Sequence, residues 1–428
     1  MKVYFNNARI MTMAAGTDII SGDLITEGDR ILYCGPVLEP GAASAAGCDR
    51  VIDVKGNLLM PGFKNAHTHS PMTFLRSLAD DMPLDRWLNE QVFPREAKLT
   101  GEDIYWLTKL AFLEYLTSGI TACFDMYFGL DSFAAASKEY GFRTVFCGSI
   151  NRFGGTVQGL AGDHEKYNNM GPLISHRLGY HAEYTTDIAM IQELAELAKA
   201  LKEPVFTHNS ETQSEVAGCI ERYGKTPTEL MDSLGLFDYG GGGFHCVHFT
   251  QRDREIFAEK GMYAVTNPAS NLKLASGIAD LVSMQQCGVK MAIGTDGPAS
   301  NNCLDMFREM FLVAGLQKVL HGDASAMPAV SVLDMAICQG ARAMGLADCD
   351  CLAAGKMADL ILIDLQRPNM QPLNHMAANL VYSGSKENVK LTMVGGKILY
   401  ENGAFYVGEE PSIVYEHANR IIKRIAAQ

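Results

Sequence analysis

Two histidines, His67 and His69, are separated by one residue and follow an apolar segment. Side chains alternate between the two faces of a β-strand, so residues i and i+2 point to the same side. Two imidazoles on one face can converge on a metal ion, for which histidine is a common ligand. The spacing also suits two solvated loop residues, so the pair alone leaves both interpretations open.

Further titratable side chains follow other predicted strands at the same kind of position. These residues are His181, His208, His245, His248 and Asp296, so six of the eleven histidines in the chain lie at predicted strand ends. The ends of parallel strands meet at one mouth of a barrel, where barrel enzymes carry their active sites. We therefore expect one shared site.

We assign His67, His69, His208 and Asp296 as the ligands of one divalent metal ion. Three imidazoles and a carboxylate suit Zn²⁺, which we expect first, and Fe²⁺ or Mn²⁺ also accept nitrogen and oxygen ligands. Taken singly, His208 could be a hydrogen-bonded core residue and Asp296 a turn or N-cap residue. The set as a whole favours ligation.

Glu211 lies three residues after His208, where the strand is expected to turn outward. A divalent ion lowers the pKa of a bound water from about 15.7 to about 7, so a nearby carboxylate can collect its proton. The alternative for Glu211 is a helix-start glutamate stabilised by the helix dipole. His245 could hydrogen-bond the attacking oxygen and the developing tetrahedral centre, and His248 is expected to support the site or to pack.

The elements that must position these residues read as alternating strands and helices. Helical periodicity is clear over 103–118 and 188–201. A doubly wound sheet would show the same periodicity, but eight strand segments and the placement of the titratable residues favour a (β/α)₈ barrel. The four glycines at 240–243 are expected to form a flexible loop. The eight strand segments are 57–69, 121–127, 143–150, 175–184, 204–208, 243–248, 262–267 and 290–296.

The two ends of the chain differ from the centre. Short alternating segments separated by turns predict strands and hairpins near both termini, and the last stretch, from 411, predicts a helix. We therefore expect residues 1–60 and 355–428 to build one small β-sandwich domain with a C-terminal helix. Residues 61–354 would form the catalytic barrel.

Composition narrows the classes of function. The chain has 428 residues, 47% of them apolar, and a net charge of −13. Such acidity does not suit non-specific nucleic-acid binding, which relies on Lys and Arg. Neither a signal peptide nor an apolar run of about 18 residues is evident, so no membrane span is expected.

The eleven cysteines are scattered, and many lie in apolar segments, which indicates the reduced thiols of a cytoplasmic protein. Cys349 and Cys351 could bind a metal, but no second pair accompanies them, so chance spacing is favoured.

The motifs resemble those of the amidohydrolase superfamily over nearly the whole chain. Residues 61–69 are similar to its first-strand signature. His208-x-x-Glu211 and the segments 245–248, 267–277 and 294–302 resemble the branch that deaminates S-adenosylhomocysteine, 5′-methylthioadenosine and adenosine. Chlorotriazine hydrolases share this branch. The resemblance implies a small-molecule nucleoside or related N-heterocycle as substrate and a homo-oligomer, either a dimer or a tetramer.

The resemblance also implies substrate contacts. Glu96 matches a carboxylate that accepts hydrogen bonds from ribose hydroxyls, Trp87 matches an aromatic of the same pocket, and His181 matches a residue that contacts the nucleoside. By pattern alone, Glu96 could equally be an exposed helix-start glutamate and Trp87 a core tryptophan. The alternative for His181 is a satisfied strand-end histidine. Arg152 is a candidate contact for the amino-acid tail of S-adenosylhomocysteine.

Two departures from relatives bear on the site. Glu183 stands where the family commonly has proline after strand four, and we expect it to add a charge near the pocket mouth. Strand four also lacks the terminal lysine that bridges two metals in binuclear relatives, which favours a single metal.

These features suggest hydrolytic deamination of an adenine nucleoside to the inosine analogue and ammonia. Glu211 would pass the proton of the attacking water to N1, His245 would steady the oxygen, and Asp296 would accept the second proton. Deamination of guanine or a pterin, or dechlorination of an s-triazine, is the alternative on the same site. A non-catalytic scaffold is a further alternative, although it would not need Glu211 and His245.

Overall fold

The computed structural model describes residues 1–14, 16–39, 47–78, 80–83 and 86–428. Its centre is a sheet of eight parallel strands in chain order, and the first and last strands come together where Asp296 N donates to His67 O at 3.0 Å. This arrangement confirms the (β/α)₈ barrel. The barrel strands are β6 (Phe63–Thr68), β7 (Ile120–Met126), β8 (Arg143–Cys147), β9 (Ile174–Ala182), β10 (Val205–Asn209), β11 (Gly241–His245), β12 (Tyr263–Thr266) and β13 (Lys290–Ile293).

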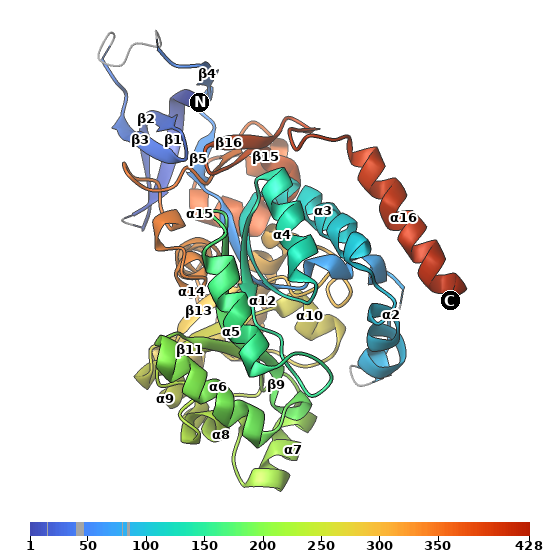
Figure 1. The fold of residues 1–428 in the computed structure, drawn as a ribbon. Helices are drawn as coiled ribbons and strands as arrows, with labels where there is room; N and C mark the ends of the chain where they lie inside the picture. The colour runs from blue at the N-terminus through green and yellow to red at the C-terminus, as the bar shows by residue number, and fades with distance from the viewer. Residues whose placement is uncertain (15, 40–46, 79, 84–85) are drawn as a thin grey trace.

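Helices cover the outside of the barrel (Figure 1). Local sequence sets their starts, since Thr100 and Asp103 form a capping box at α3 and Asp187 caps α6. Both helices predicted within the barrel are confirmed. The longer helices are α3 (Gly101–Thr117), α4 (Leu130–Tyr140), α5 (Val157–Asn168), α6 (Ile188–Leu201), α7 (Gln213–Tyr223), α8 (Pro227–Ser233), α9 (Gln251–Glu259), α10 (Pro268–Lys273), α11 (Leu281–Gln286), α12 (Met306–His321), α13 (Ala329–Asp334) and α16 (Pro411–Ala427).

Shorter helical segments connect these elements. They are η1 (Ser70–Leu75), η2 (Trp87–Val92), α2 (Phe93–Glu96), η3 (Glu183–Thr185), η4 (Met335–Gln339), α14 (Gly340–Ala343), η5 (Ala347–Cys349), η6 (Pro368–Met370), α15 (Met376–Ala378), η7 (Asn379–Ser383) and η8 (Lys386–Asn388).

Strands from both termini form a second sheet, as predicted, and Figure 1 shows the blue and red strands side by side. β14 pairs antiparallel with β5 and so joins the two ends of the chain. Side chains such as Phe5, Leu59 and Leu391 give this sheet a core of its own. We propose 1–60 and 355–428 as the limits of this domain. Its strands are β1 (Lys2–Met13), β2 (Gly16–Glu27), β3 (Arg30–Pro36), β4 (Arg50–Asp53), β5 (Leu58–Pro61), β14 (Leu360–Ile363), β15 (Val389–Val394), β16 (Lys397–Glu401) and β17 (Ala404–Phe405).

The segment predicted as one strand over 57–69 is two strands. β5 belongs to the terminal sheet and β6 to the barrel, and only Gly62 separates them. A Cβ atom at Gly62 would lie 2.1 Å from the Thr121 side chain. Because glycine has no side chain, the chain can pass close to β7 where it leaves the terminal sheet and enters the barrel.

The expectation of a flexible glycine loop at 240–243 is wrong. Gly241, Gly242 and Gly243 are buried in β11, the sixth barrel strand. A Cβ at Gly241 would lie 1.9 Å from the Val205 carbonyl oxygen, and one at Gly242 would lie 2.6 Å from the Tyr263 carbonyl oxygen. The glycines allow close approach of neighbouring backbones, which is a strand role that composition alone does not reveal.

A buried ion pair joins the base of the barrel to the terminal sheet. Arg143, at the start of β8, donates to both carboxylate oxygens of Asp359, at 2.6 and 3.0 Å. The Gly395 amide donates to the same carboxylate at 2.7 Å. Burial alone would raise the pKa of Asp359, but the Arg143 guanidinium holds that pKa below its ordinary value.

All eleven cysteines are free thiols, as predicted, and Cys349 and Cys351 lie outside the metal-ligating clusters of the described residues. No helix within the described ranges combines the length and apolar character that crossing a membrane requires.

Candidate active site

The four predicted ligands converge at the C-terminal mouth of the barrel. His67 and His69 come from the end of β6, His208 from β10, and Asp296 from the loop after β13. His69 Nε2 lies 3.2 Å and His67 Nε2 lies 3.6 Å from Asp296 Oδ1. His67, His208 and His245 form a second group, and in each group the possible ligand atoms lie within 4.8 Å of one another.

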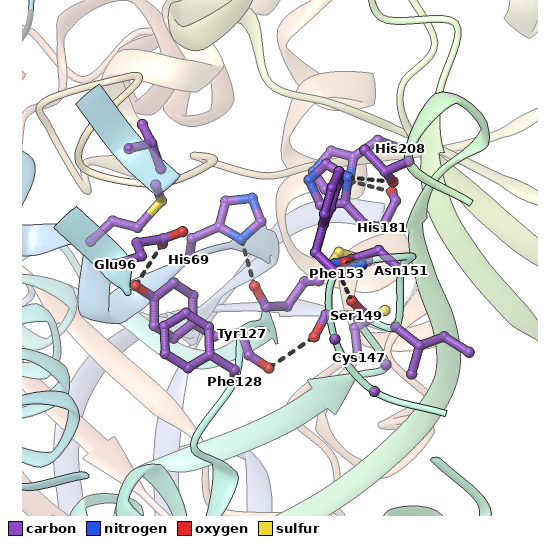
Figure 2. A pocket seen from close by; sticks show the side chains of 18 of the residues that line it. His69, Glu96, Tyr127, Phe128, Cys147, Ser149, Asn151, Phe153, His181 and His208 are labelled. Carbon is purple, nitrogen blue, oxygen red and sulfur yellow. Dashed lines mark hydrogen bonds between the residues drawn. The ribbon is translucent and has the colours of Figure 1, made fainter. Parts of the chain in front are cut away.

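Two of these imidazoles are oriented by their outer nitrogens. His69 Nδ1 lies 2.6 Å from the Met126 carbonyl oxygen, and His208 Nδ1 lies 2.7 Å from the His181 carbonyl oxygen (Figure 2). Donation of Nδ1–H to a carbonyl fixes the tautomer and leaves Nε2 with a lone pair. Both rings therefore present an acceptor nitrogen to the centre.

His67 gives the clearest test of whether these donors fit a cation. Its ring stacks on Phe244 with centroids 3.8 Å apart, and both ring nitrogens are buried without a hydrogen-bond partner among the described residues. Buried polar atoms are normally satisfied, so an orphaned imidazole needs an explanation. A divalent ion bound by nitrogen and oxygen ligands supplies one.

The two oxygens of the Asp296 carboxylate have different partners. Its Oδ2 accepts from the Ser270 hydroxyl at 2.6 Å and from the Ser300 hydroxyl at 2.8 Å. These bonds leave Oδ1 to face His67 and His69. Burial alone would raise the pKa of Asp296, but the nearby imidazoles, His69 foremost, hold it well below its ordinary value.

Glu211 is buried beside the cluster without belonging to it. The Ser276 hydroxyl donates to Glu211 Oε1 at 3.1 Å, and His245 Nε2 lies 3.8 Å from Oε2. Burial raises the pKa of Glu211. A carboxyl group with a raised pKa holds a proton more readily than an exposed carboxyl group, which suits a group that must take and return one.

His245 lies between Glu211, the predicted base, and Asp296, one of the predicted ligands. Its Nδ1 lies 2.7 Å from Asn271 Oδ1, and its Nε2 lies 4.0 Å from Asp296 Oδ2. This geometry points Nε2 toward the space where a reacting atom would sit. His248 Nε2 lies 2.8 Å from the Ser276 carbonyl oxygen, so His248 supports the residue that holds Glu211.

A cavity of about 1070 Å³ opens above the cluster, and Trp87, Glu96 and His181 line it. Tyr127 donates its hydroxyl to Glu96 at 2.7 Å, and burial raises the pKa of Glu96 to about 7. His181 Nδ1 lies 3.0 Å from Thr185 Oγ1. Figure 2 shows Glu96 and Tyr127 on one side of the cavity and His181 on the other.

Two residues singled out from the sequence lie elsewhere. Arg152 is outside the described lining of the cavity, and its guanidinium donates to the Tyr184 carbonyl at 2.7 Å. Glu183 is buried and pairs with Arg222 of α7 at 2.5 Å. The expected charge at the pocket mouth is therefore wrong, because β9 ends at Ala182 and the η3 turn directs Glu183 toward α7.

Sequence reasoning missed several residues that hold the site. Ser270, Asn271 and Ser276 lie in the segment 267–277, whose resemblance to relatives was the available signal. Glu215 accepts the backbone amides of Ser210 and Glu211 at 2.9 and 2.8 Å. A glutamate near the start of a helix carries no pattern that distinguishes this role.

The fold and the site together define a barrel enzyme with a candidate metal centre at its C-terminal mouth. Comparison with known protein families matches residues 58–399 to the Amidohydrolase family. The chain belongs to this family.

Similar proteins include 5-methylthioadenosine/S-adenosylhomocysteine deaminase of Moorella thermoacetica, 42% identical over 90% of this chain and 92% of that protein. 5′-Deoxyadenosine deaminase of Methanothermobacter thermautotrophicus is 38% identical over 92% of each chain. A crystal structure of an adenosine deaminase from Xanthomonas campestris with bound zinc has a TM-score of 0.92 and 32% identity, covering 100% of this chain and 99% of that one.

Proposed function

We propose that this protein is a metal-dependent hydrolytic deaminase of adenine nucleosides. The substrate would be S-adenosylhomocysteine, 5′-methylthioadenosine, 5′-deoxyadenosine or adenosine, and the products the inosine analogue and ammonia. The observation that carries this proposal is the buried Glu211 carboxylate, 3.8 Å from His245 and beside the imidazole cluster. The named activities of the similar deaminases support it.

His67, His69, His208 and Asp296 would hold one divalent ion, which we propose is Zn²⁺, with Fe²⁺ or Mn²⁺ as alternatives. When bound, such an ion would lower the pKa of water to about 7 and supply a nucleophile at neutral pH. The Zn²⁺ in the Xanthomonas campestris structure supports this choice.

The protein's own groups would move the protons. Glu211 takes a proton from the attacking water and returns it to N1 of the purine, a transfer favoured by its raised pKa. His245 would lie beside the oxygen that adds at C6 and would steady the tetrahedral centre. Asp296 accepts the proton of the new C6 hydroxyl and passes it to the amino group, which leaves as ammonia when the C6–N bond breaks.

Three residues of the cavity wall would bind the nucleoside. Glu96 would accept hydrogen bonds from the ribose hydroxyls, Trp87 would pack beside the ribose, and His181 would contact the nucleoside. Arg152 remains the candidate for a charged 5′ tail, although it would first have to leave the Tyr184 carbonyl.

A substrate panel tests the proposal. Purified enzyme with measured metal content would be incubated with the four adenine nucleosides, guanine, a pterin and a chlorinated s-triazine. Loss of adenine absorbance with release of ammonia supports nucleoside deamination. Turnover of guanine, the pterin or the s-triazine without turnover of any adenine nucleoside would favour the alternative reactions at the same site. Absence of both metal and turnover would favour a scaffold.

We also propose a homo-oligomer, a dimer or a tetramer, which light scattering would test. A cytoplasmic location is supported by the eleven free thiols. The net charge of −13 supports the absence of nucleic acid among the ligands.

A further inference from the structure

A tight turn presents an aromatic side chain to the cavity. The backbones of Asn151 and Gly154 exchange hydrogen bonds of 3.0 and 3.2 Å, and Asn151 Oδ1 accepts from the Phe153 amide at 2.8 Å. Phe153 lines the cavity although its surface is 81% exposed (Figure 2). A large apolar side chain held in this way on a rigid turn provides a surface for an apolar ligand group.

Other parts of the cavity wall also carry aromatic and apolar side chains. Phe128, 41% exposed, stacks on Tyr127 with ring centroids 4.4 Å apart, and both rings line the cavity. Ile150 lies against Gly155, where a Cβ would come within 2.7 Å of the Ile150 side chain. These side chains give the cavity carbon surface that an apolar ligand group could contact.

The charged groups that line the cavity are mostly acidic. Among the described residues that line the cavity, Lys166 is the single lysine or arginine, and its ammonium group pairs with Asp131. Asp163 lines the same region. The residues outside the described ranges contain neither lysine nor arginine. A carboxylate that entered here would meet a net negative charge.

From these observations we infer that the site selects adenine nucleosides whose 5′ substituent is small and uncharged, and that Phe153 is the residue that sets this preference. This inference rests on the proposed nucleoside deamination. The phenyl ring would pack on a 5′-methylthio or 5′-methyl group. The zwitterionic amino-acid chain of S-adenosylhomocysteine would place its carboxylate on apolar and acidic surface. The nearby cations have other partners, since Lys166 pairs with Asp131 and Arg152 donates to the Tyr184 carbonyl, so the lost hydration of that carboxylate is not compensated.

The test compares kcat/KM for 5′-methylthioadenosine, adenosine and S-adenosylhomocysteine on the zinc-loaded full-length enzyme. We expect kcat/KM for 5′-methylthioadenosine to exceed that for S-adenosylhomocysteine by about tenfold or more, the discrimination that one such pocket contact supplies. Phe153→Ala would lower kcat/KM for 5′-methylthioadenosine by about tenfold and lower that for adenosine less, because adenosine carries only a hydroxyl there.

A charge-adding variant makes the test sharper. Phe153→Arg would bring a cation to the turn and raise kcat/KM for S-adenosylhomocysteine relative to 5′-methylthioadenosine by about tenfold. Phe311→Ala removes an aromatic of similar exposure, 52%, from α12 outside the cavity lining and serves as the matched control. Its kinetic constants for all three nucleosides would match the unaltered enzyme.

The possible outcomes distinguish failure of this inference from failure of the proposed nucleoside deamination. Equal or higher kcat/KM for S-adenosylhomocysteine in the unaltered enzyme would overturn the preference and leave nucleoside deamination standing. An unchanged substrate ratio in both Phe153 variants would overturn the role of Phe153. Failure to deaminate any adenine nucleoside would overturn both proposals.

Discussion

Glu215 holds the backbone of Glu211. One oxygen of the Glu215 carboxylate accepts the Glu211 amide at 2.8 Å, and the other accepts the Ser210 amide at 2.9 Å. Ser210 has a φ of +53°, a left-handed conformation that side chains rarely adopt. The carboxylate therefore stabilises a turn that the backbone would not favour by itself, and this turn places the predicted base.

Glu215→Gln should disturb this turn without removing any side chain that lines the cavity among the described residues. An amide has one acceptor oxygen, so its NH₂ group would face one of the two backbone donors. Because small displacements of a catalytic group are costly, we expect kcat to fall by about 10- to 100-fold with little change in KM. Steady-state kinetics on the best nucleoside would measure this.

The control for this variant is Glu229→Gln. Glu229 accepts the Thr226 amide at 3.0 Å in the capping box of α8, so it has a similar backbone role outside the cavity lining. We expect its kcat to be unchanged. A similar loss in both variants would show that general destabilisation, and not placement of Glu211, explains the effect.

Glu211→Gln should separate metal binding from catalysis. The amide keeps the size of the side chain but cannot collect a proton. We expect full metal content and a fall in kcat of about 10²- to 10⁴-fold, the range for loss of a general acid or base. Elemental analysis and turnover on the same sample would check this, and near-normal turnover would rule out the role of Glu211.

Removal of the metal should abolish activity and lower the unfolding temperature. The His67 nitrogens have no partner within the described structure, so His67→Ala would reduce zinc content below one equivalent. A ligand at 100 times its Kd stabilises the folded state by about 2.7 kcal/mol, so re-addition of Zn²⁺ should raise the Tm of the stripped native enzyme.

His321→Ala is the matched control for the metal experiment. His321 pairs with Asp280 at 2.9 Å on the surface and belongs to neither ligand group. Its zinc content and its response to chelation should equal those of the unaltered protein. Full zinc content in His67→Ala would contradict the assignment of that ligand.

Substrate binding should depend on pH through Glu96. Its pKa is raised to about 7 by burial, so the carboxylate is neutral below that pH and ionised above it. An ionised acceptor binds hydroxyl groups more strongly, so we expect the KM for adenosine to fall by about fivefold as the pH rises from about 6 to about 8. Glu96→Gln, and 2′,3′-dideoxyadenosine as substrate, should both remove this dependence.

The raised pKa of Glu96 also makes the free energy of unfolding depend on pH. The pKa of Glu96 in the folded protein lies above the ordinary value of 4.5, so the folded state binds the proton more tightly than the unfolded state. The stabilisation from this group is complete below about pH 4.5 and is lost as the pH rises to about 7. Urea unfolding of Glu96→Gln across this range should show a weaker fall in stability.

Asp359→Ala should strongly destabilise the fold. It would leave the buried Arg143 guanidinium without its carboxylate, which costs about 3–5 kcal/mol for a buried pair. Glu259→Ala, which removes a partner of Arg252 in an exposed pair, should change the free energy of unfolding by less than about 1 kcal/mol. Urea midpoints for the two variants at neutral pH would test the contrast.

Strand positions and titratable residues were predictable because barrel strands are short apolar runs whose ends carry the chemistry. The segment ending at Asp296 shows this, since β13 lies where the pattern placed it and Asp296 follows it at the barrel mouth. The strand over Gly241–His245 was harder to predict, because glycine usually marks a loop. Its use in β11 depends on how closely the Val205 and Tyr263 backbones approach, which is a property of the folded sheet.

Long-range partners were not predictable from one sequence. Glu183 looked like a mouth residue until Arg222, 39 positions later, proved to be its partner. Glu215 gave no signal because its role is defined by two backbone amides and not by a motif. Local pattern selects the candidate reacting groups, whereas the residues that hold them depend on tertiary contacts.

The single residue between β5 and β6 constrains how this protein can change during evolution. Gly62 alone connects β5 of the terminal sheet to β6, the strand that carries His67. Recombination at this residue would therefore have to preserve the strand pairing of both sheets. Exchange of the terminal domain between relatives would keep the predicted ligands in place only where both parents share the register of β5 with β14 and of β6 with β7. We expect lineages of this fold to diversify through loops at the barrel mouth, such as the turn that bears Phe153, while residues 58–68 are inherited as one block.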